Sequence, residues 1–91
     1  MGKGKKVIAY YYENFKRLGV PIPWRYYTYI LTREYGFEMS SGSGAQVAFT
    51  RGEIRFIAHR PHGRDMIVDM TSRKNAIREI SKLEASDEGS A

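Results

Sequence analysis

The sequence contains no cysteine, so neither a disulfide bond nor a thiolate metal site can form. A small domain without cysteine must rely on its hydrophobic core, and this composition suits a reducing cytoplasm. The chain also has no long uninterrupted apolar run, which excludes a membrane-spanning helix. Acidic residues are in the minority, ten against fifteen Lys and Arg, giving a net charge of +5. This excess of positive charge favours a polyanionic partner, RNA above all.

The remaining composition fits one small globular unit. Of the 91 residues, 42% are hydrophobic, which is near the average for a soluble domain. We expect residues 1–84 to form a single domain and the polar residues 85–91 to form a disordered tail. Seven tyrosines are many for this length, and they could serve as core, as a stacking platform or as a partner surface.

Apolar residues recur at helical spacing in two segments of the first half and again near the end of the chain. The first predicted helix spans residues 6–18, and the second spans residues 24–35, where Gly36 ends it. A final helix is expected from a cap at Thr71 or Ser72 to about residues 82–83. Between the second and last helices, the spacing of apolar residues changes from a helical pattern to simple alternation.

Three segments in that interval alternate between apolar and polar residues, as strands do. They are residues 37–40, 46–50 and 53–59, and Arg51-Gly52 is a turn signal between the last two. The predicted class is therefore α+β, with a three-stranded antiparallel meander packed on helices. We expect Ile54, Phe56 and Ala58 to face those helices, because a register slip of one residue would expose all of them.

The loop Gly42-Ser43-Gly44-Ala45 opens directly into a predicted strand. Its small residues allow backbone N–H groups to approach a phosphate closely. It is not a nucleotide-binding P-loop, because no Gly-Lys-Ser/Thr follows. A flexible connection between two strands is the simpler interpretation of the same residues.

The motif His59-Arg60-Pro61-His62 contains both histidines of the chain. An imidazole can take a proton from a ribose 2′-OH and return one to the leaving oxygen, while an arginine stabilises the charge on phosphorus. A metal site formed by two histidines is a rival interpretation, but no acidic or thiolate third ligand accompanies them in the motif. A basic surface loop with exposed histidines is the simplest alternative.

Basic residues gather in the strand and loop half of the sequence. They suggest a surface that follows a phosphate backbone, although a solvated charged face would look the same. The group consists of Arg51, Arg55, Arg60, Arg64, Arg73 and Lys74.

The order of these motifs resembles the HicA family of bacterial and archaeal toxins over residues 24–83. The resemblance is carried by Gly36-Phe37 after a helix, the loop 42–45 before a strand ending at Phe49, and residues 59–62 closing the next strand. It implies a small α-β-β-β-α fold similar to a double-stranded-RNA-binding domain, to which the helix over residues 6–18 is an addition. It also implies a metal-independent mRNA interferase, an endoribonuclease that needs no cofactor and is neutralised by a HicB antitoxin.

One residue departs from the family pattern. The family loop typically reads Gly-Ser-His or Gly-Ser-x-His with a catalytic histidine, and Ala45 stands at the matching position. Either Ala45 is an engineered replacement, or the chain belongs to a divergent branch that retains His59 and His62. The candidate catalytic residues are accordingly His59 and His62, with Ala45 marking the family position. The candidate RNA-binding residues are Ser43, Arg51, Arg55, Arg60, Arg64 and Lys74.

Two other classes of function fit the same sequence. A non-catalytic RNA-binding module of this architecture needs the arginines but neither histidine. A protein-interaction module of phage or mobile-element origin would use exposed tyrosines and would tolerate the loss of both the arginines and the histidines. The expected partners are RNA and a HicB-like antitoxin, with a second copy of the chain as a further candidate and no membrane.

Overall fold

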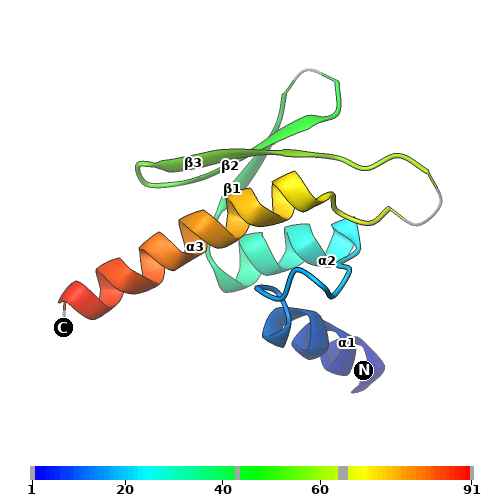
Figure 1. Cartoon of the computed structure of the whole chain (residues 1–91), viewed down its shortest axis with the longest axis horizontal. Helices are drawn as coiled ribbons and strands as arrows, with labels where there is room; N and C mark the ends of the chain where they lie inside the picture. Colours follow the sequence, from blue (N-terminus) through cyan, green and yellow to red (C-terminus); the bar gives the residue numbers. More distant parts are fainter. Residues whose placement is uncertain (1, 43, 64–65, 91) are drawn as a thin grey trace.

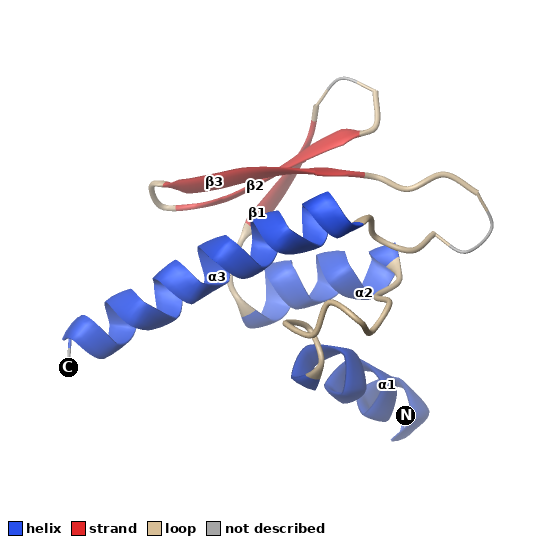
Figure 2. Cartoon of the chain, in the orientation of Figure 1, coloured by secondary structure: helices blue, strands red, loops and turns tan. Residues whose placement is uncertain are grey.

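The computed structural model describes residues 2–42, 44–63 and 66–90, with a three-stranded antiparallel sheet on helices (Figure 1). The elements are the helices α1 (Gly2–Glu13), α2 (Trp24–Tyr29) and α3 (Met70–Ser90), the π-helical turn η1 (Ile30–Glu34) that continues α2, and the strands β1 (Glu38–Ser41), β2 (Gln46–Arg51) and β3 (Ile54–His59). Helices α2 and α3 lie on one side of the sheet, and α1 lies beyond α2 (Figure 2). The predicted α+β class and the strand order β1-β2-β3 are confirmed.

The sheet register follows from the alternation of apolar residues in β2 and β3. Val47 pairs with Ala58 and Phe49 with Phe56, and all of these face the helices. The rings of Phe49 and Phe56 stack at 5.3 Å between centroids. Because Arg51 pairs with Ile54, the turn consists of residues 52–53, one residue later than the expected Arg51-Gly52. Gly52 has a φ of 60°, which two-residue hairpin turns require at their first position.

The first helix differs from the expected range of 6–18. It ends at Glu13, because the next residues tighten into turns and Asn14 binds the carbonyl of Tyr10 with its side chain at 2.8 Å. Phe15 is therefore in a turn rather than a helix, yet it is completely buried in the core. Phe15 fits the helical spacing of apolar residues because it packs in the core, although it is not itself helical.

The last helix is longer at both ends than expected. It begins at Met70, with the carboxylate of Asp69 accepting the backbone N–H of Ser72 at 3.4 Å, so Asp69 rather than Thr71 or Ser72 is the cap. It continues to Ser90 because no proline, and no glycine before Gly89, interrupts it. Residues 85–90 of the expected tail are thus helical, and Ala91 lies outside the described residues.

Arg73 was expected on the phosphate-binding surface, and the structure shows that this is wrong. Its side chain is only 2% exposed, and its guanidinium donates to the carbonyls of Phe15, Arg17 and Val20. These carbonyls belong to the segment that joins α1 to α2. Arg73 therefore stabilises the interior of the fold, and its buried guanidinium is not available to RNA.

Tyr27 leads to a prediction about alkaline unfolding. Its buried hydroxyl donates to the carbonyl of Ser72 at 2.9 Å, and burial, followed by the negative charge of Asp69, raises the pKa of Tyr27 well above its ordinary value of 10.0. Above about pH 10 the unfolded chain loses this proton while the folded chain keeps it. The free energy of unfolding should then fall by about 1.4 kcal/mol per pH unit through this group.

Urea unfolding at about pH 8 and about pH 11 measures this slope. Tyr27→Phe should cost about 1 kcal/mol at the lower pH, through the lost hydrogen bond, and should show a flatter alkaline decline than the parent. Tyr10→Phe is the matched control, because Tyr10 is 53% exposed. A decline as steep in Tyr27→Phe as in the parent would mean that other groups cause the alkaline unfolding.

Candidate nucleic-acid interface

The glycine-rich loop and the histidine motif meet at one end of the sheet. Gln46, the first residue of β2, pairs with His59, the last residue of β3. Beyond this pair, the N–H of Arg60 donates to the carbonyl of Ala45 at 2.8 Å. The N–H of Gly42 closes the loop by donating to the carbonyl of Gln46 at 2.9 Å. The two motifs are therefore neighbours, as the antiparallel topology predicts.

His59 lies on the face of the sheet opposite the core. The buried residues of β3 are Phe56 and Ala58, so the alternating positions of Arg55 and His59 point to the other face, where both are exposed. Gln46 stands opposite His59 on that face. Among the described residues, the candidate site is thus an exposed strand end.

The backbone of His59 is hydrogen-bonded to the start of α3. Its N–H donates to the hydroxyl oxygen of Ser72 at 3.0 Å, and that hydroxyl donates to the carboxylate of Asp69 at 2.6 Å. Ser72 is completely buried. The spacing Asp-x-x-Ser indicates the capping pair of Asp69 and Ser72 but not the contact of Ser72 with His59.

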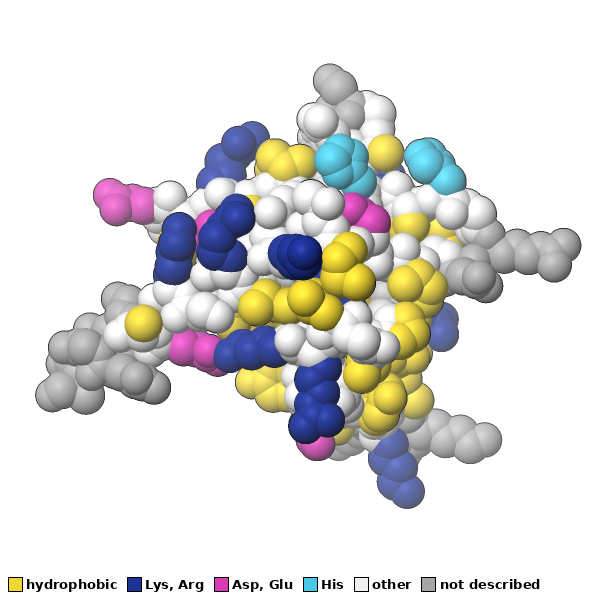
Figure 3. All heavy atoms as spheres, viewed as in Figure 1, with side chains coloured by type: hydrophobic (Ala, Val, Ile, Leu, Met, Phe, Trp, Pro, Cys, Tyr) yellow, Lys and Arg dark blue, Asp and Glu magenta, His cyan; other side chains and the backbone are white. Residues whose placement is uncertain are grey.

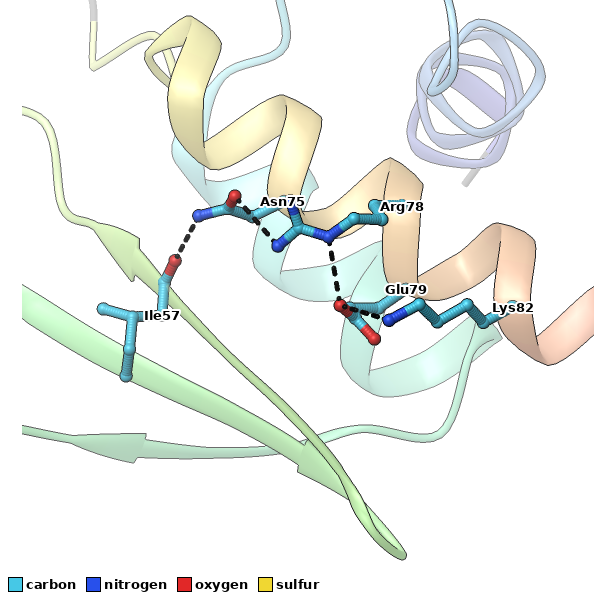
Figure 4. Close-up of polar contacts among 5 residues, drawn as sticks. All are labelled: Ile57, Asn75, Arg78, Glu79 and Lys82. Carbon is cyan, nitrogen blue, oxygen red and sulfur yellow. Dashed lines mark hydrogen bonds and ion pairs between the residues drawn. The ribbon is translucent and has the colours of Figure 1, made fainter.

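A second contact two residues earlier fixes the same edge. The side-chain amide of Asn75 donates to the carbonyl of Ile57 at 3.2 Å (Figure 4). Next to it, the carboxylate of the buried residue Glu79 lies 3.3 Å from the side chain of Arg78 and 3.5 Å from that of Lys82. Helix α3 therefore covers the free backbone edge of β3, which would otherwise be open to pairing with another chain.

The predicted RNA-binding residues do not all converge on the histidines. Arg60 and His62 lie exposed beside His59. Arg51 is at the opposite end of β2, about 17 Å away along the strand. Arg55 is on the face of His59 but about 14 Å from it, at the other end of β3. Lys74 is exposed on α3, and both Ser43 and Arg64 lie outside the described residues.

Histidine and basic side chains are exposed, but they come from different layers of the fold. Figure 3 shows the imidazoles at the surface and Lys and Arg side chains in the region of α3, which packs on the core side of the sheet. Within residues 2–42, 44–63 and 66–90, no hydrogen bond orients either imidazole, and no group of His, Asp and Glu could hold a metal ion. In the same part of the chain, no helix is both long and apolar enough to cross a membrane.

Comparisons with known proteins add no assignment to this geometry: no family model, no curated protein and no solved structure matches the chain.

Proposed function

We propose that this protein binds RNA at the surface made by Gly42, Ala45, His59 and Arg60, in the manner of a HicA-like toxin. The observation that carries the proposal is the hydrogen bond of 2.8 Å between the N–H of Arg60 and the carbonyl of Ala45. It joins the two motifs on which the resemblance depends. The exposed arginine supplies charge for a phosphate, and the small loop residues let the backbone approach it.

Cleavage at this surface would need a base, an acid and a cation around one phosphate. Arg60 supplies the cation, and His59 and His62 are the imidazoles on the described surface. Ala45 stands beside Arg60 where the HicA-like pattern has a histidine, and it carries no titratable group. We therefore propose that the chain retains the RNA-binding part of an endoribonuclease and lacks the loop base. A HicB-like antitoxin covering this surface is the partner that the proposal implies.

A second candidate is an RNA-binding module that never cleaves. It is favoured by one observation, namely that no hydrogen bond to the described residues orients His59 or His62. Catalytic imidazoles are usually held by a neighbouring group. Both candidates require the arginine at position 60, and they differ only in whether a base restores cleavage.

Charge reversal at Arg60 tests the shared part of the proposal. Arg60→Glu should weaken binding to a mixed RNA pool and reduce the slope of log affinity against log salt by roughly one, because one phosphate contact is lost. Fluorescence anisotropy at several salt concentrations measures both quantities. The matched control is Arg51→Glu, which makes the same change of charge at the far end of the sheet. Equal effects of the two variants would contradict a site at Arg60.

A further inference from the structure

A concave surface lies between α1 and α2, away from the histidines. It is an open groove of about 290 Å³ lined by Ile8, Ala9 and Tyr12 of α1 and by Tyr29 and Glu34 of α2 and η1. Four of these five side chains are apolar or aromatic. Among the lining residues that the structure describes, Glu34 alone carries a charge.

The aromatic side chains of the groove are partly open to solvent. Tyr12 and Tyr29 are each 41% exposed, so two large aromatic rings of one groove are open to solvent. The ring of Tyr12 packs against the ring of Tyr35 at 5.8 Å between centroids, and this contact helps to fix its position. The groove therefore offers ring surface on which another flat, apolar group can stack.

Positive charge flanks the groove along the helix that carries Tyr29. Arg25 and Arg33 are one turn before and one turn after Tyr29, and all of these side chains are exposed. The guanidinium of Arg33 lies over the Tyr29 ring at 5.9 Å. The guanidinium of Arg25 lies over the neighbouring Tyr26 ring at 4.8 Å. Proteins that hold single-stranded nucleic acid combine aromatic rings that stack on bases with cations that contact phosphates.

The position of Glu34 depends on the π-helical turn. The N–H of Tyr35 bonds to the carbonyl of Ile30, five residues back, at 3.1 Å. This wider turn brings the end of η1, including Glu34, to the same groove as Tyr29. Such turns occur mostly as local insertions in α-helices and are frequent at functional sites.

A lone carboxylate selects among the bases by hydrogen bonding. It can only accept hydrogen bonds, through two adjacent oxygens. Guanine presents two adjacent N–H donors on its Watson–Crick edge, whereas uracil presents one N–H between two carbonyl oxygens that a carboxylate repels. Unpaired bases in single-stranded RNA are read on this edge while they stack on aromatic side chains.

We infer that this groove binds an unpaired guanine of single-stranded RNA, stacked on Tyr29 and hydrogen-bonded to Glu34. The inference rests on the proposed RNA-binding function and adds to it a second contact, a strand type and a base. Arg25 and Arg33 contact the phosphates on either side of that base.

The test compares short uridine oligonucleotides with and without one central guanosine. Fluorescence anisotropy should show roughly tenfold tighter binding of the guanosine strand, a typical gain for hydrogen bonds to a charged group. Replacing guanosine with inosine, which lacks the N2 amino group, should remove much of this gain. Free GMP should bind far more weakly than the strand, because it lacks the flanking phosphates. GMP binding as tight as the strand would overturn the assignment to RNA.

Variants assign the preference to the groove. Glu34→Gln should reduce the tenfold preference to less than about twofold, because the amide retains only one acceptor. Tyr29→Leu should weaken binding of the guanosine strand roughly tenfold, as expected for a lost stacking contact. The matched controls are Glu38→Gln, on the exposed strand β1, and Tyr10→Leu, an exposed tyrosine of α1 outside the groove lining. Neither should change the preference.

The outcomes separate this inference from the proposed function. If Arg60→Glu has no effect while Glu34→Gln abolishes the guanine preference, the groove is the RNA site and the surface at Arg60 is not. If the parent binds both strands equally, or if Glu34→Gln and Tyr29→Leu behave like their controls, the groove does not bind guanine. The proposal for Arg60 would survive that result.

Discussion

Replacing Ala45 with histidine is expected to raise the rate of RNA cleavage by roughly two to four powers of ten, the usual contribution of a general acid or base. The carbonyl of Ala45 accepts the N–H of Arg60, so an imidazole at position 45 starts from a backbone fixed against the arginine that would hold the phosphate. Ala45 is only half-buried, which leaves space for the larger side chain. The effect is large because the change adds a reacting group.

The products follow from the chemistry of that group. The imidazole takes the proton of the ribose 2′-OH, whose oxygen forms a bond to phosphorus. The bond from phosphorus to the 5′-oxygen breaks, and a protonated imidazole returns a proton to that oxygen. The fragments should therefore carry a 2′,3′-cyclic phosphate and a 5′-hydroxyl, and the reaction should proceed in EDTA. Sequencing of fragment ends from an RNA pool measures both the rate and the chemistry.

Controls distinguish a base from a change of shape. Ala45→Gln adds a polar side chain of similar reach that does not titrate, and it should leave the rate at the parent level. Adding His59→Ala to Ala45→His should lower the rate again if His59 is the acid. If Ala45→His cleaves no faster than the parent, the loop is not a HicA-like catalytic position. Cleavage by the parent itself in EDTA would assign the base to His59 or His62, and the single alanine variants would then identify it.

The sheet could be predicted from sequence because its signals are local. Phe49 and Phe56 alternate with polar residues, and Gly52 marks the turn, so register and topology follow from neighbouring positions. The helix ends could not, because side chains such as Asn14 and Asp69 hydrogen-bond to backbone groups there. Periodicity places a helix but does not detect such competition.

The candidate site was only partly accessible to sequence reasoning, for the same reason. The meeting of Ala45 with Arg60 follows from the predicted antiparallel meander, because such a sheet brings the start of its second strand beside the end of its third. The support of His59 by Ser72 joins residues 13 apart on different elements, and no local pattern reveals it. Charge alone also misplaced Arg73, since an arginine in a basic segment looks the same in sequence whether it is exposed or buried.

Replacing Arg73 with leucine is expected to lower the free energy of unfolding by about 3 kcal/mol, a large part of what a small domain has. The side chain donates to the carbonyl of Phe15 at 2.7 Å, to that of Arg17 at 2.8 Å and to that of Val20 at 2.7 Å. Burial lowers the pKa of Arg73, yet an arginine stays charged at neutral pH, so these are charge-assisted bonds. Leucine fills part of the volume but leaves the carbonyls without a donor.

Thermal unfolding at neutral pH measures the loss, which should be roughly 12 °C or more in Tm for a domain of this length. Lys74→Leu is the matched control, because it removes the same charge from the adjacent, exposed position and should change stability by less than about 0.5 kcal/mol. Arg73→Lys keeps the charge but not the planar fork, so it should recover only part of the stability. The same loss in Lys74→Leu would mean that net charge, rather than the contacts of Arg73 with the segment after α1, sets the stability.

That segment positions α1, and α1 supplies Ile8, Ala9 and Tyr12 to the groove. Arg73→Leu should therefore also weaken the guanine preference, while Lys74→Leu retains it.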